Sequence, residues 1–574
     1  MLPHNVANYK VSVVRPSALP DCISRATPMN RSAHIDSFTR DRLPKAGLWP
    51  EFRFTFPELR YPERLNCVAE LLDRWLEKGW GNRPCFRSPT TNWSYSQTAT
   101  QVNRIANVLV RDLGMVPGNR VLLRSPNTPM FVATYLAVMK AGGVVVATMP
   151  LLRAGELATA IEKSQATLAL CDARLMDALA EARASTPTLK RIVAFGSPEA
   201  ELDRLAPAAS AEFTACDTAS DDVCLLGFTS GTTGGPKATM HFHRDVLAIA
   251  DSYGRHVLTA GAADVFIGSP PLAFTFGLGG LVIFPLRVGA SSVLLEKAPP
   301  DDLLAAIRTY RPTVVFTAPT AYKAILGKLQ PGDTTSLRIC VSAGETLPAS
   351  TFDAWKAATG ITMMDGIGAT EMLHIFIGSP AAEARAGATG RVVPGYEARV
   401  VDDQGREVAD GTPGHLAVRG PTGCRYLDDS RQKNYVKNGW NYPGDTYVRD
   451  ADGYFWFKAR SDDMIVSSGY NIAGPEVELA LLTHPAVAEC GVVGLPDVDR
   501  GAIVSAFVVV RPGVAPDAAL ATTLQEHVKA AIAPYKYPRI VRFVAELPKT
   551  ASGKLRRNVL RESTADSSSL RDSE

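Results

Sequence analysis

The stretch from Phe228 to Lys237 reads FTSGTTGGPK and combines hydroxyl side chains, glycines and one lysine. Glycines expose backbone N–H groups, hydroxyls donate hydrogen bonds and lysine supplies a cation, so this is the chemistry of an anion-binding loop. The apolar run VCLLGF precedes the loop and the helical pattern RDVLAIADSY follows it, which predicts a strand, a loop and a helix N-terminus around a phosphate. The loop is not a Walker A motif, because Pro236 precedes Lys237 and Ala238 follows it.

Further segments rich in glycine, hydroxyl and charged side chains follow this loop along the chain. They read SAGETLP (342–348), DGIGATE (365–371), GDTYVRDADGYFWFKARSDDMI (444–465), SSGYNIAGPEVE (467–478) and PKTASGKLRRN (548–558). In this order and spacing they resemble the motifs of the adenylate-forming enzymes, which include acyl-CoA synthetases, peptide-synthetase adenylation domains and luciferases. Agreement of several separate motifs over more than 300 residues makes the resemblance specific.

The resemblance implies that the opening loop holds the departing phosphates of ATP. The residues given this role are Thr229, Ser230, Gly231, Thr232, Thr233 and Gly234. Lys237 adds a positive charge, which suits a reaction that expels pyrophosphate. Glu371 resembles the family's Mg²⁺ ligand, and Thr370 resembles the residue beside the α-phosphate. One glutamate suffices, since Mg²⁺ on a triphosphate usually takes one or two protein carboxylates.

The same resemblance assigns the nucleoside half of ATP to other residues. Gly344 and Glu345 match the segment that lies along the adenine, and Asp365 with Gly366 matches a second adenine contact. Asp445 resembles the carboxylate that accepts both ribose hydroxyls, and Arg460 resembles a further ribose or phosphate contact. Asp445 taken alone would be interpreted as a solvated turn aspartate.

Three residues in the C-terminal part of the chain match the catalytic lysine, the hinge and the tunnel of the family's enzymes. Lys554 in SGKLRR resembles the catalytic lysine that bridges the attacking carboxylate and the α-phosphate, where an ammonium lowers the repulsion between two anions. Asp462 matches the hinge about which a small domain rotates between the two half-reactions. Gly469 matches the wall of a tunnel for the pantetheine arm of CoA, because a residue without Cβ permits close passage. A surface lysine and an ordinary turn glycine are the simpler interpretations of Lys554 and Gly469.

The acid-binding pocket is indicated by PPLAFTFGLGG (270–280) together with DGIGATEMLHIF. These segments most resemble benzoate–CoA and 2-aminobenzoate–CoA ligases. Phe276, Ile367 and Gly368 are expected to form a flat slot for an aromatic ring. His374 is expected either to contact the ring or an ortho substituent, or to be a packed core residue. Many relatives carry Tyr-Gly before Thr-Glu, whereas Ile367, Gly368 and Ala369 fill that region here.

The elements that must position these residues follow from the hydrophobic pattern. Between about 65 and 430, unbroken apolar runs such as RVLLRS and PTVVFTAP alternate with amphipathic stretches such as DDLLAAIRTY, which predicts parallel sheets covered by helices on both faces. The region is long enough for two packed α/β sheets. From about 390 to 460, short strands separated by turn signals predict a small antiparallel barrel or sheet.

The chain is therefore predicted to be an α/β protein with a large N-terminal domain and a small mobile α+β C-terminal domain. The expected boundaries are a disordered extension at 1–28, a large AMP-binding domain at 29–461, a small domain with the catalytic lysine at 462–562 and a disordered tail at 563–574. Met29 could be the true start of the protein.

Composition limits the classes of partner. Formal net charge is +3 over 574 residues, with acidic and basic residues mixed along the chain, so nothing indicates nucleic-acid binding. The 9 cysteines are scattered without a C-x-x-C pair, which fits a reducing cytoplasm. The most apolar run is interrupted by Pro285 and Arg287, so no membrane span is expected. The sequence is consistent with either a monomer or a homodimer.

The leading interpretation is a two-step ligase in which an aromatic carboxylic acid and ATP give an acyl-adenylate, and CoA then takes the acyl group. A stand-alone adenylation enzyme that loads a carrier protein is the alternative. A nucleotide-binding module without catalysis is disfavoured by the presence of Lys554, Glu371, Asp445 and Arg460 together. The interpretation as a Rossmann dehydrogenase has weak support, because GVVGLP lacks the G-x-G-x-x-G spacing.

Overall fold

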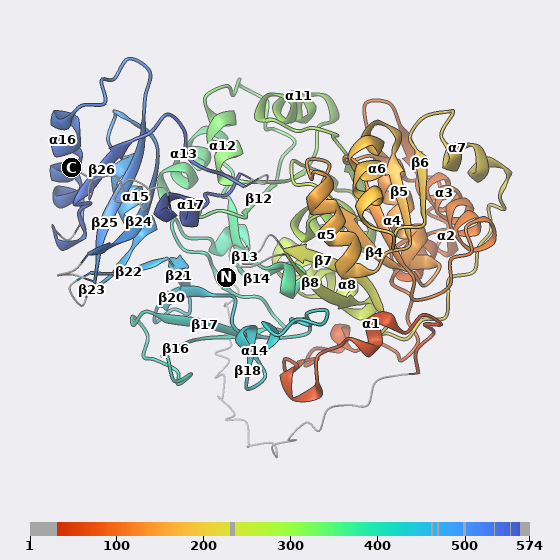
Figure 1. The fold of residues 1–574 in the computed structure, drawn as a ribbon. Helices are drawn as coiled ribbons and strands as arrows, with labels where there is room; N and C mark the ends of the chain where they lie inside the picture. The colour runs from red at the N-terminus through yellow and green to blue at the C-terminus, as the bar shows by residue number, and fades with distance from the viewer. Residues whose placement is uncertain are drawn as a thin grey trace, which may run out of the picture.

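The computed structural model describes residues 31–229, 236–460, 463–467, 470–497, 501–532, 534–550 and 553–562. Within these residues the chain forms two large mixed sheets, an antiparallel sheet and a smaller C-terminal unit, which is drawn in blue to one side in Figure 1. The α/β class and the separate small C-terminal unit agree with the prediction. The predicted disordered ends lie outside the described residues, as do Asp462 and Gly469.

The first large sheet has the strand order β6-β5-β3-β4-β7-β8. Its strands are β3 (Arg120–Arg124), β4 (Val144–Thr148), β5 (Leu168–Asp172), β6 (Arg191–Phe195), β7 (Val223–Thr229) and β8 (Lys237–Phe242). All neighbours run parallel except β7 and β8, which are antiparallel. β3, β4 and β5 are buried along their whole length, as expected of a sheet covered on both faces.

The second large sheet has the order β15-β14-β13-β12-β11-β9-β10-β1-β2. Its strands are β1 (Pro84–Arg87), β2 (Asn92–Ser94), β9 (Val265–Gly268), β10 (Ser291–Val293), β11 (Val314–Thr317), β12 (Ile339–Ala343), β13 (Met364–Gly368), β14 (Ile375–Gly378) and β15 (Arg391–Val392). The strands from β1 to β13 in this order are parallel, and antiparallel strands flank them at both edges.

Helices pack against both large sheets. They are α1 (Phe38–Asp41), α2 (Arg74–Glu77), α3 (Tyr95–Asn107), α4 (Pro129–Lys140), α5 (Ala154–Ser164), α6 (Met176–Ser185), α7 (Glu201–Leu205), α8 (His243–Ile249), α9 (Thr275–Leu278), α10 (Phe284–Val288), α11 (Pro300–Tyr310), α12 (Pro319–Leu326) and α13 (Ala349–Thr359). One core joins Val121 of β3 to Phe316 of β11, so the two sheets share an interior. Leu122 packs in a different core with α5 and α6, because successive strand residues face opposite sides.

The antiparallel sheet holds β16 (Glu397–Val401), β17 (Gly414–Arg419), β18 (Val436–Lys437), β19 (Trp440–Asn441), β20 (Asp445–Arg449) and β21 (Phe455–Arg460), with α14 (Gln432–Tyr435) beside it. The C-terminal unit holds β22 (Met464–Ser467), β23 (Tyr470–Ala473), α15 (Gly474–Leu482), β24 (Val487–Asp497), β25 (Gly501–Val510), α16 (Ala518–Ala531), β26 (Ile540–Phe543) and α17 (Arg557–Glu562). Its interior, which includes Val477, Val504 and Leu524, is a core of its own.

The sequence-based prediction was wrong in one respect that concerns the site. The loop was expected to lie between a strand and the helical run RDVLAIADSY; that helix is present as α8 from His243, but the unpredicted strand β8 lies between it and the loop. KATMHF pairs antiparallel with β7, with Thr229 opposite Lys237. β8 forms because an edge of the sheet offers hydrogen-bond partners to a short run that includes apolar residues. The loop therefore connects the strands of a hairpin, and no helix N-terminus follows it directly.

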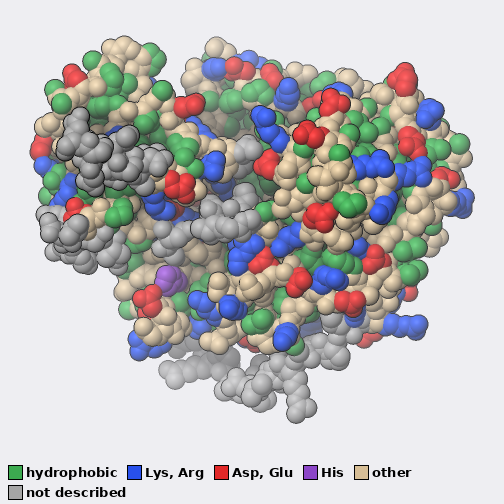
Figure 2. Space-filling model, in the orientation of Figure 1, with side chains coloured by type: hydrophobic (Ala, Val, Ile, Leu, Met, Phe, Trp, Pro, Cys, Tyr) green, Lys and Arg blue, Asp and Glu red, His purple; other side chains and the backbone are tan. Residues whose placement is uncertain are grey.

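Two surface properties complete the description. None of the helices that the structure describes is long and apolar enough to cross a bilayer. Figure 2 shows basic and acidic side chains interspersed over the visible face, without a continuous basic area.

Candidate active site

The described ends of the predicted phosphate loop face each other across the β7–β8 hairpin. Thr229 ends β7, Lys237 begins β8, and the two are paired in register. The hydroxyl oxygen of Thr229 is buried and has no hydrogen-bond partner among the described residues. A buried hydroxyl without a partner is costly and suits a polar ligand. Ser230, Gly231, Thr232, Thr233 and Gly234 lie outside the described residues.

Glu371, the predicted magnesium ligand, is buried in a short 3-10 turn, η9 (Thr370–Met372). Tyr426 donates its hydroxyl to Oε1 of Glu371. The ammonium of Lys237 lies 5.0 Å from the centre of the Tyr426 ring. Burial and the Glu371 carboxylate both raise the pKa of the Tyr426 hydroxyl, so it stays a proton donor. A single buried carboxylate that is held at one oxygen fits one protein ligand to a magnesium ion on a triphosphate.

Backbone pairing explains why Tyr426 reaches this place. Thr239 of β8 forms an isolated bridge with Tyr426, and the Leu427 N–H donates to the Ala238 carbonyl at 2.8 Å. The segment around Tyr426 therefore lies along β8. Sequence reasoning did not identify Tyr426, because no motif links it to Glu371.

Thr370 packs closely against the hairpin. A Cβ at Gly227 of β7 would lie 2.8 Å from Cγ2 of Thr370, so the absence of a side chain at Gly227 permits this approach. Behind the turn lies a fully buried ion pair between Arg425 and Asp245, with His241 3.8 Å from Asp245. Burial lowers the pKa of His241, which keeps its ring neutral.

The residues expected to contact adenine lie on, or directly after, two paired parallel strands. Ser342 of β12 pairs with Asp365 of β13, and Ala343 pairs with Gly366. Gly344 follows β12 directly with φ of +90°, a conformation that L-residues rarely adopt. Burial raises the pKa of Asp365 well above its usual value, and its Oδ1 has no hydrogen-bond partner among the described residues. Glu345, next along the chain, completes this group.

Asp445 and Arg460 face each other across neighbouring strands of the antiparallel sheet. They are register partners of β20 and β21, and Nη1 of Arg460 lies 3.1 Å from Oδ1 of Asp445. Asp445 is buried, whereas Arg460 is half-exposed. Arg460 therefore covers the carboxylate from the solvent side.

Lys554 belongs to the C-terminal unit but lies among the nucleotide-side residues. Its backbone N–H donates to the Thr550 hydroxyl at 3.1 Å, and its carbonyl accepts from the Thr550 N–H, so it sits on a tight turn. The side chain is accessible to solvent, yet the protein around it is dense enough that desolvation lowers the pKa of its ammonium. Arg460 lowers that pKa further, and the carboxylates of Asp445, Glu345 and Glu371 oppose the shift. The ammonium therefore lies within electrostatic reach of all four side chains.

The predicted aryl pocket is assembled around His374. The ring of His374 lies 5.8 Å from Phe276, 4.6 Å from Phe284, 5.6 Å from Tyr253 and 6.4 Å from Phe316. Neither of its ring nitrogens has a hydrogen-bond partner among the described residues, and burial lowers its pKa to about 3.

Two glycines determine how closely the chain packs around this ring. A Cβ at Gly279 would lie 2.3 Å from Cδ2 of His374, and a Cβ at Gly368 would lie 2.8 Å from the His374 carbonyl oxygen. Ile367 is half-buried against the same core. Phe276, Ile367, Gly368 and His374 are thus brought together, although sequence reasoning missed Phe284, Phe316 and Tyr253, which come from other elements.

A cavity of about 250 Å³ opens next to this cluster and shares Phe284 with it. Its polar lining comes from Arg74, Asp251, Arg255 and Arg287, none of which the sequence motifs select. Arg287 and Asp251 already neutralise each other at 2.8 Å. This cavity is therefore separate from the predicted site residues.

Comparison with known proteins shows which family this chain resembles. The family described as AMP-binding enzyme matches residues 72–425, and the AMP-binding enzyme C-terminal domain matches residues 476–554. A benzoate–CoA ligase of Thauera aromatica is 37% identical over 520 residues, covering 88% of this chain and 98% of the relative.

Solved structures agree with the sequence comparison. The anthranilate CoA ligase AuaEII in complex with anthranoyl-AMP has a TM-score of 0.84 at 34% identity, covering 90% of this chain and 100% of that one. A benzoate CoA ligase from Burkholderia xenovorans has a TM-score of 0.79 at 33% identity, covering 87% and 100%. Motifs, fold and relatives coincide along most of the chain, which belongs to the AMP-binding enzyme family of adenylate-forming enzymes.

Proposed function

We propose that this protein is an ATP-dependent aryl–CoA ligase for a benzoate-type acid, either benzoate or 2-aminobenzoate. In the first step a carboxylate oxygen of the acid attacks the α-phosphorus of ATP, and pyrophosphate leaves with the electron pair of the broken P–O bond. In the second step the CoA thiolate attacks the acyl carbon, and AMP leaves. Family membership and the relatives named above support this chemistry.

The position of Lys554 supports the first step. Its ammonium would lie between the acid's carboxylate and the α-phosphate, which are both anionic, and would reduce their repulsion. Thr370 would contact the α-phosphate, while Lys237, Thr229 and the glycine-rich loop would hold the departing phosphates. Asp445 and Arg460 would bind the ribose, and Gly344, Glu345, Asp365 and Gly366 would border the adenine.

We propose Glu371 as the protein ligand of the metal. Glu371 would hold Mg²⁺, with Tyr426 orienting the carboxylate through the hydrogen bond to Oε1. When bound, Mg²⁺ neutralises charge on the phosphates.

One observation carries the aryl assignment: His374 is buried within a shell of aromatic rings, and its ring nitrogens lack partners among the described residues. Aromatic side chains favour a flat apolar ligand through offset or edge-to-face contacts. With its pKa lowered to about 3, His374 is neutral near pH 7 and can exchange a hydrogen bond with a neutral ortho amine without charge repulsion.

The decisive experiment measures pyrophosphate release and AMP formation with ATP, CoA and a panel of acids. The panel contains benzoate, 2-aminobenzoate, hydroxybenzoates, cinnamate and medium-chain fatty acids. We expect kcat/KM to be highest for benzoate or 2-aminobenzoate. Preference for a fatty acid would refute the aryl assignment, and AMP release that does not depend on CoA would favour the carrier-loading alternative.

A variant separates the role of His374 from simple packing. His374→Phe retains an aromatic ring but loses both nitrogens, so we expect it to lower kcat/KM for 2-aminobenzoate about tenfold relative to benzoate. Phe316→Leu, a change in the same shell, serves as the control that alters packing without removing a polar group. An equal loss for both acids in His374→Phe would show that His374 has only a packing role.

The second half-reaction would need a rearrangement. Lys554 would leave the site when the small domain turns about Asp462, and Gly469 would then line the path of the pantetheine arm. To test this, the rates of adenylation and of thioester formation are measured in Asp462→Pro and in the control Asp463→Ala. Slower thioester formation with normal adenylation in Asp462→Pro alone would support the proposal.

A further inference from the structure

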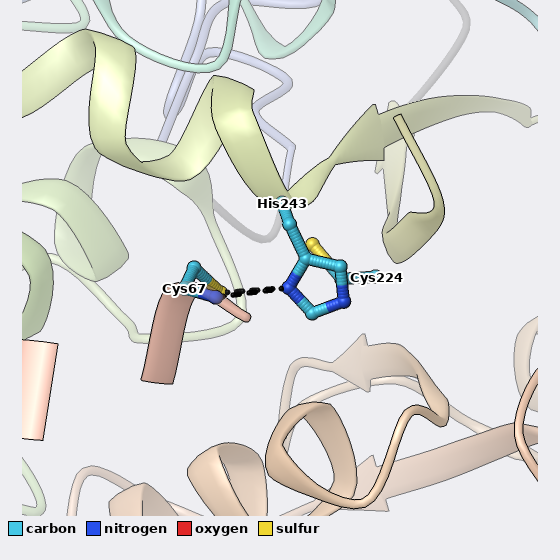
Figure 3. Close-up of side chains that lie close together, drawn as sticks. All are labelled: Cys67, Cys224 and His243. Atoms are coloured by element: carbon cyan, nitrogen blue, oxygen red, sulfur yellow. Dashed lines mark hydrogen bonds between the residues drawn. The ribbon is translucent and has the colours of Figure 1, made fainter. Parts of the chain in front are cut away.

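Cys67, Cys224 and His243 form a compact cluster outside the predicted active site. Figure 3 shows the three side chains converging from separate parts of the chain. Cys67 lies just before the π-helical turn η3 (Ala69–Asp73), Cys224 is the second residue of β7, and His243 is the first residue of α8. Their ligand atoms all lie within 4.8 Å of one another, and each residue is 0% exposed.

We propose that Cys67, Cys224 and His243 bind a structural zinc ion. Sulfur and imidazole nitrogen are the donors that Zn²⁺ prefers, and two cysteines with one histidine are a known set of three protein ligands that leaves the fourth position to another ligand. Nδ1 of His243 lies 3.2 Å from Sγ of Cys67, somewhat less than the roughly 3.6 Å that tetrahedral Zn–S and Zn–N bonds imply, so the two atoms would move apart slightly to admit the ion.

Charge favours zinc over other soft ions at this depth. Two thiolates, one neutral imidazole and Zn²⁺ sum to zero, whereas a monovalent copper ion would leave a net negative charge in the interior. An uncompensated charge is costly in an apolar core. Cys67 and Cys224 belong to the core that also contains Tyr135 and Leu225, both buried.

Binding would replace existing hydrogen bonds of the three ligands, including the one between Nδ1 of His243 and Sγ of Cys67. The Cys67 N–H donates to Nδ1 of His243 at 3.2 Å, a long hydrogen bond, and in the zinc form Nδ1 would point its lone pair at the metal. The Cys224 thiol donates to the His241 carbonyl oxygen at 3.6 Å, and the thiolate of the zinc form would give up this hydrogen bond. His243 Nε2, which has no partner among the residues that the structure describes, would carry the proton.

The position of the cluster indicates what the ion would do. Cys224 and His243 flank the base of the β7–β8 hairpin, and Thr229 and Lys237 lie at its other end. Zinc would join that base to the segment of Cys67, which is distant in sequence. The ion would stabilise the hairpin and would take no part in the chemistry. Because the ligands are buried, zinc would enter as the chain folds and exchange slowly afterwards.

The test begins with the full-length chain, unfolded in chelator, freed of metal and refolded with or without Zn²⁺. Metal content is measured by mass spectrometry after gel filtration, and X-ray absorption at the zinc edge identifies the ligands. We expect one zinc per chain, a first shell containing two sulfurs and a higher thermal midpoint for the zinc form. Cys67→Ser and Cys224→Ser should lose the zinc, whereas Cys340→Ser, a buried cysteine in β12, should retain it.

Three results would overturn the proposal. They are no zinc in the refolded wild-type chain, a first shell without sulfur, and zinc retained in both Cys67→Ser and Cys224→Ser. If these variants do not fold, the wild-type measurements decide, because metal content and X-ray absorption do not depend on them.

Discussion

The ammonium of Lys554 loses its proton at a lower pH than an ordinary lysine, because its surroundings lower its pKa. Desolvation and Arg460 lower its pKa, so the neutral amine forms below the usual lysine value of ~10.4. If adenylation needs the charged form, its rate must fall as pH rises through this lowered pKa. Lys554 is therefore the residue at which the proposed chemistry is most directly testable.

We expect acid-dependent ATP–pyrophosphate exchange in the wild type to decline at a pH below the normal lysine range. Lys554→Arg, which stays charged, should lose this alkaline decline, and Lys554→Ala should lower the exchange rate ~100-fold or more at all pH values. Exchange measured across pH for the three proteins gives the answer. The same alkaline decline in Lys554→Arg would assign the titration to another group.

Tyr426 is expected to act through Glu371 rather than on the substrate. Removing its hydroxyl in Tyr426→Phe leaves the Glu371 carboxylate without this hydrogen bond, so the Mg²⁺ concentration for half-maximal adenylation should rise about tenfold. Tyr435→Phe is the matched control, since Tyr435 packs 5.7 Å from Tyr426 and its hydroxyl has no hydrogen-bond partner in the described part of the chain. An unchanged Mg²⁺ requirement in Tyr426→Phe would contradict this role.

At the scale of elements, the β7–β8 hairpin depends on a buried charge pair. Arg425 and Asp245 are both fully buried and bonded to each other, and the Met240 N–H donates to the Arg425 carbonyl at 2.7 Å. Burial alone would raise the pKa of Asp245, but Arg425 and His241 outweigh it and hold that pKa below its usual value. The segment that places Tyr426 is thus fastened to α8.

Arg425→Leu should lower the free energy of unfolding by about 3–5 kcal/mol, because it leaves the Asp245 carboxylate buried and uncompensated. The double variant Arg425→Leu, Asp245→Leu should recover much of this loss. The native pair stabilises above the unfolded aspartate pKa of ~3.9, and this stabilisation is lost as pH falls through the lower native pKa. Denaturant titrations provide the measurement, and a double variant no more stable than Arg425→Leu would count against the argument.

At the scale of the whole molecule, the segment from Ser32 to Arg40 fastens the N-terminal part of the chain to the first large sheet. Asp222, which directly precedes β7, accepts from the Ala33 N–H at 2.9 Å and pairs with Arg40 at 3.3 Å. Asp36 accepts from Asn119 at 2.8 Å and also pairs with Arg120. These contacts join the chain's N-terminal side to the strand that ends in Thr229.

A chain that starts at Met29 keeps every one of these contacts, so its thermal midpoint should equal that of the full chain. A chain that starts at Arg42 loses them and should melt about 5 °C lower. Differential scanning calorimetry of the three proteins tests this. Equal midpoints for all three would show that the segment adds no stability.

Local chemistry and periodicity determined much of this protein from sequence. Runs such as RVLLR and VVFT predict buried strands because a sheet covered on both faces needs apolar residues at successive positions, and β3 and β11 are buried at every residue. Resemblance to a family motif selected Asp445 and Arg460, and the structure places atoms of their side chains 3.1 Å apart. The sequence pattern did not predict strand β8, because β8 forms by pairing with the edge strand β7, which local periodicity does not report.

Tertiary structure alone decided which distant residues meet. Tyr426 reaches Glu371, Phe284 and Tyr253 reach His374, and Cys67 reaches His243 because sheet order and helix packing bring together segments far apart in the chain. Periodicity reports only which face of its own element a residue occupies. The sequence by itself therefore determined the elements and the chemistry of the motifs, whereas the packing of elements decided the environment that sets the pKa of Lys554 and the shell around His374.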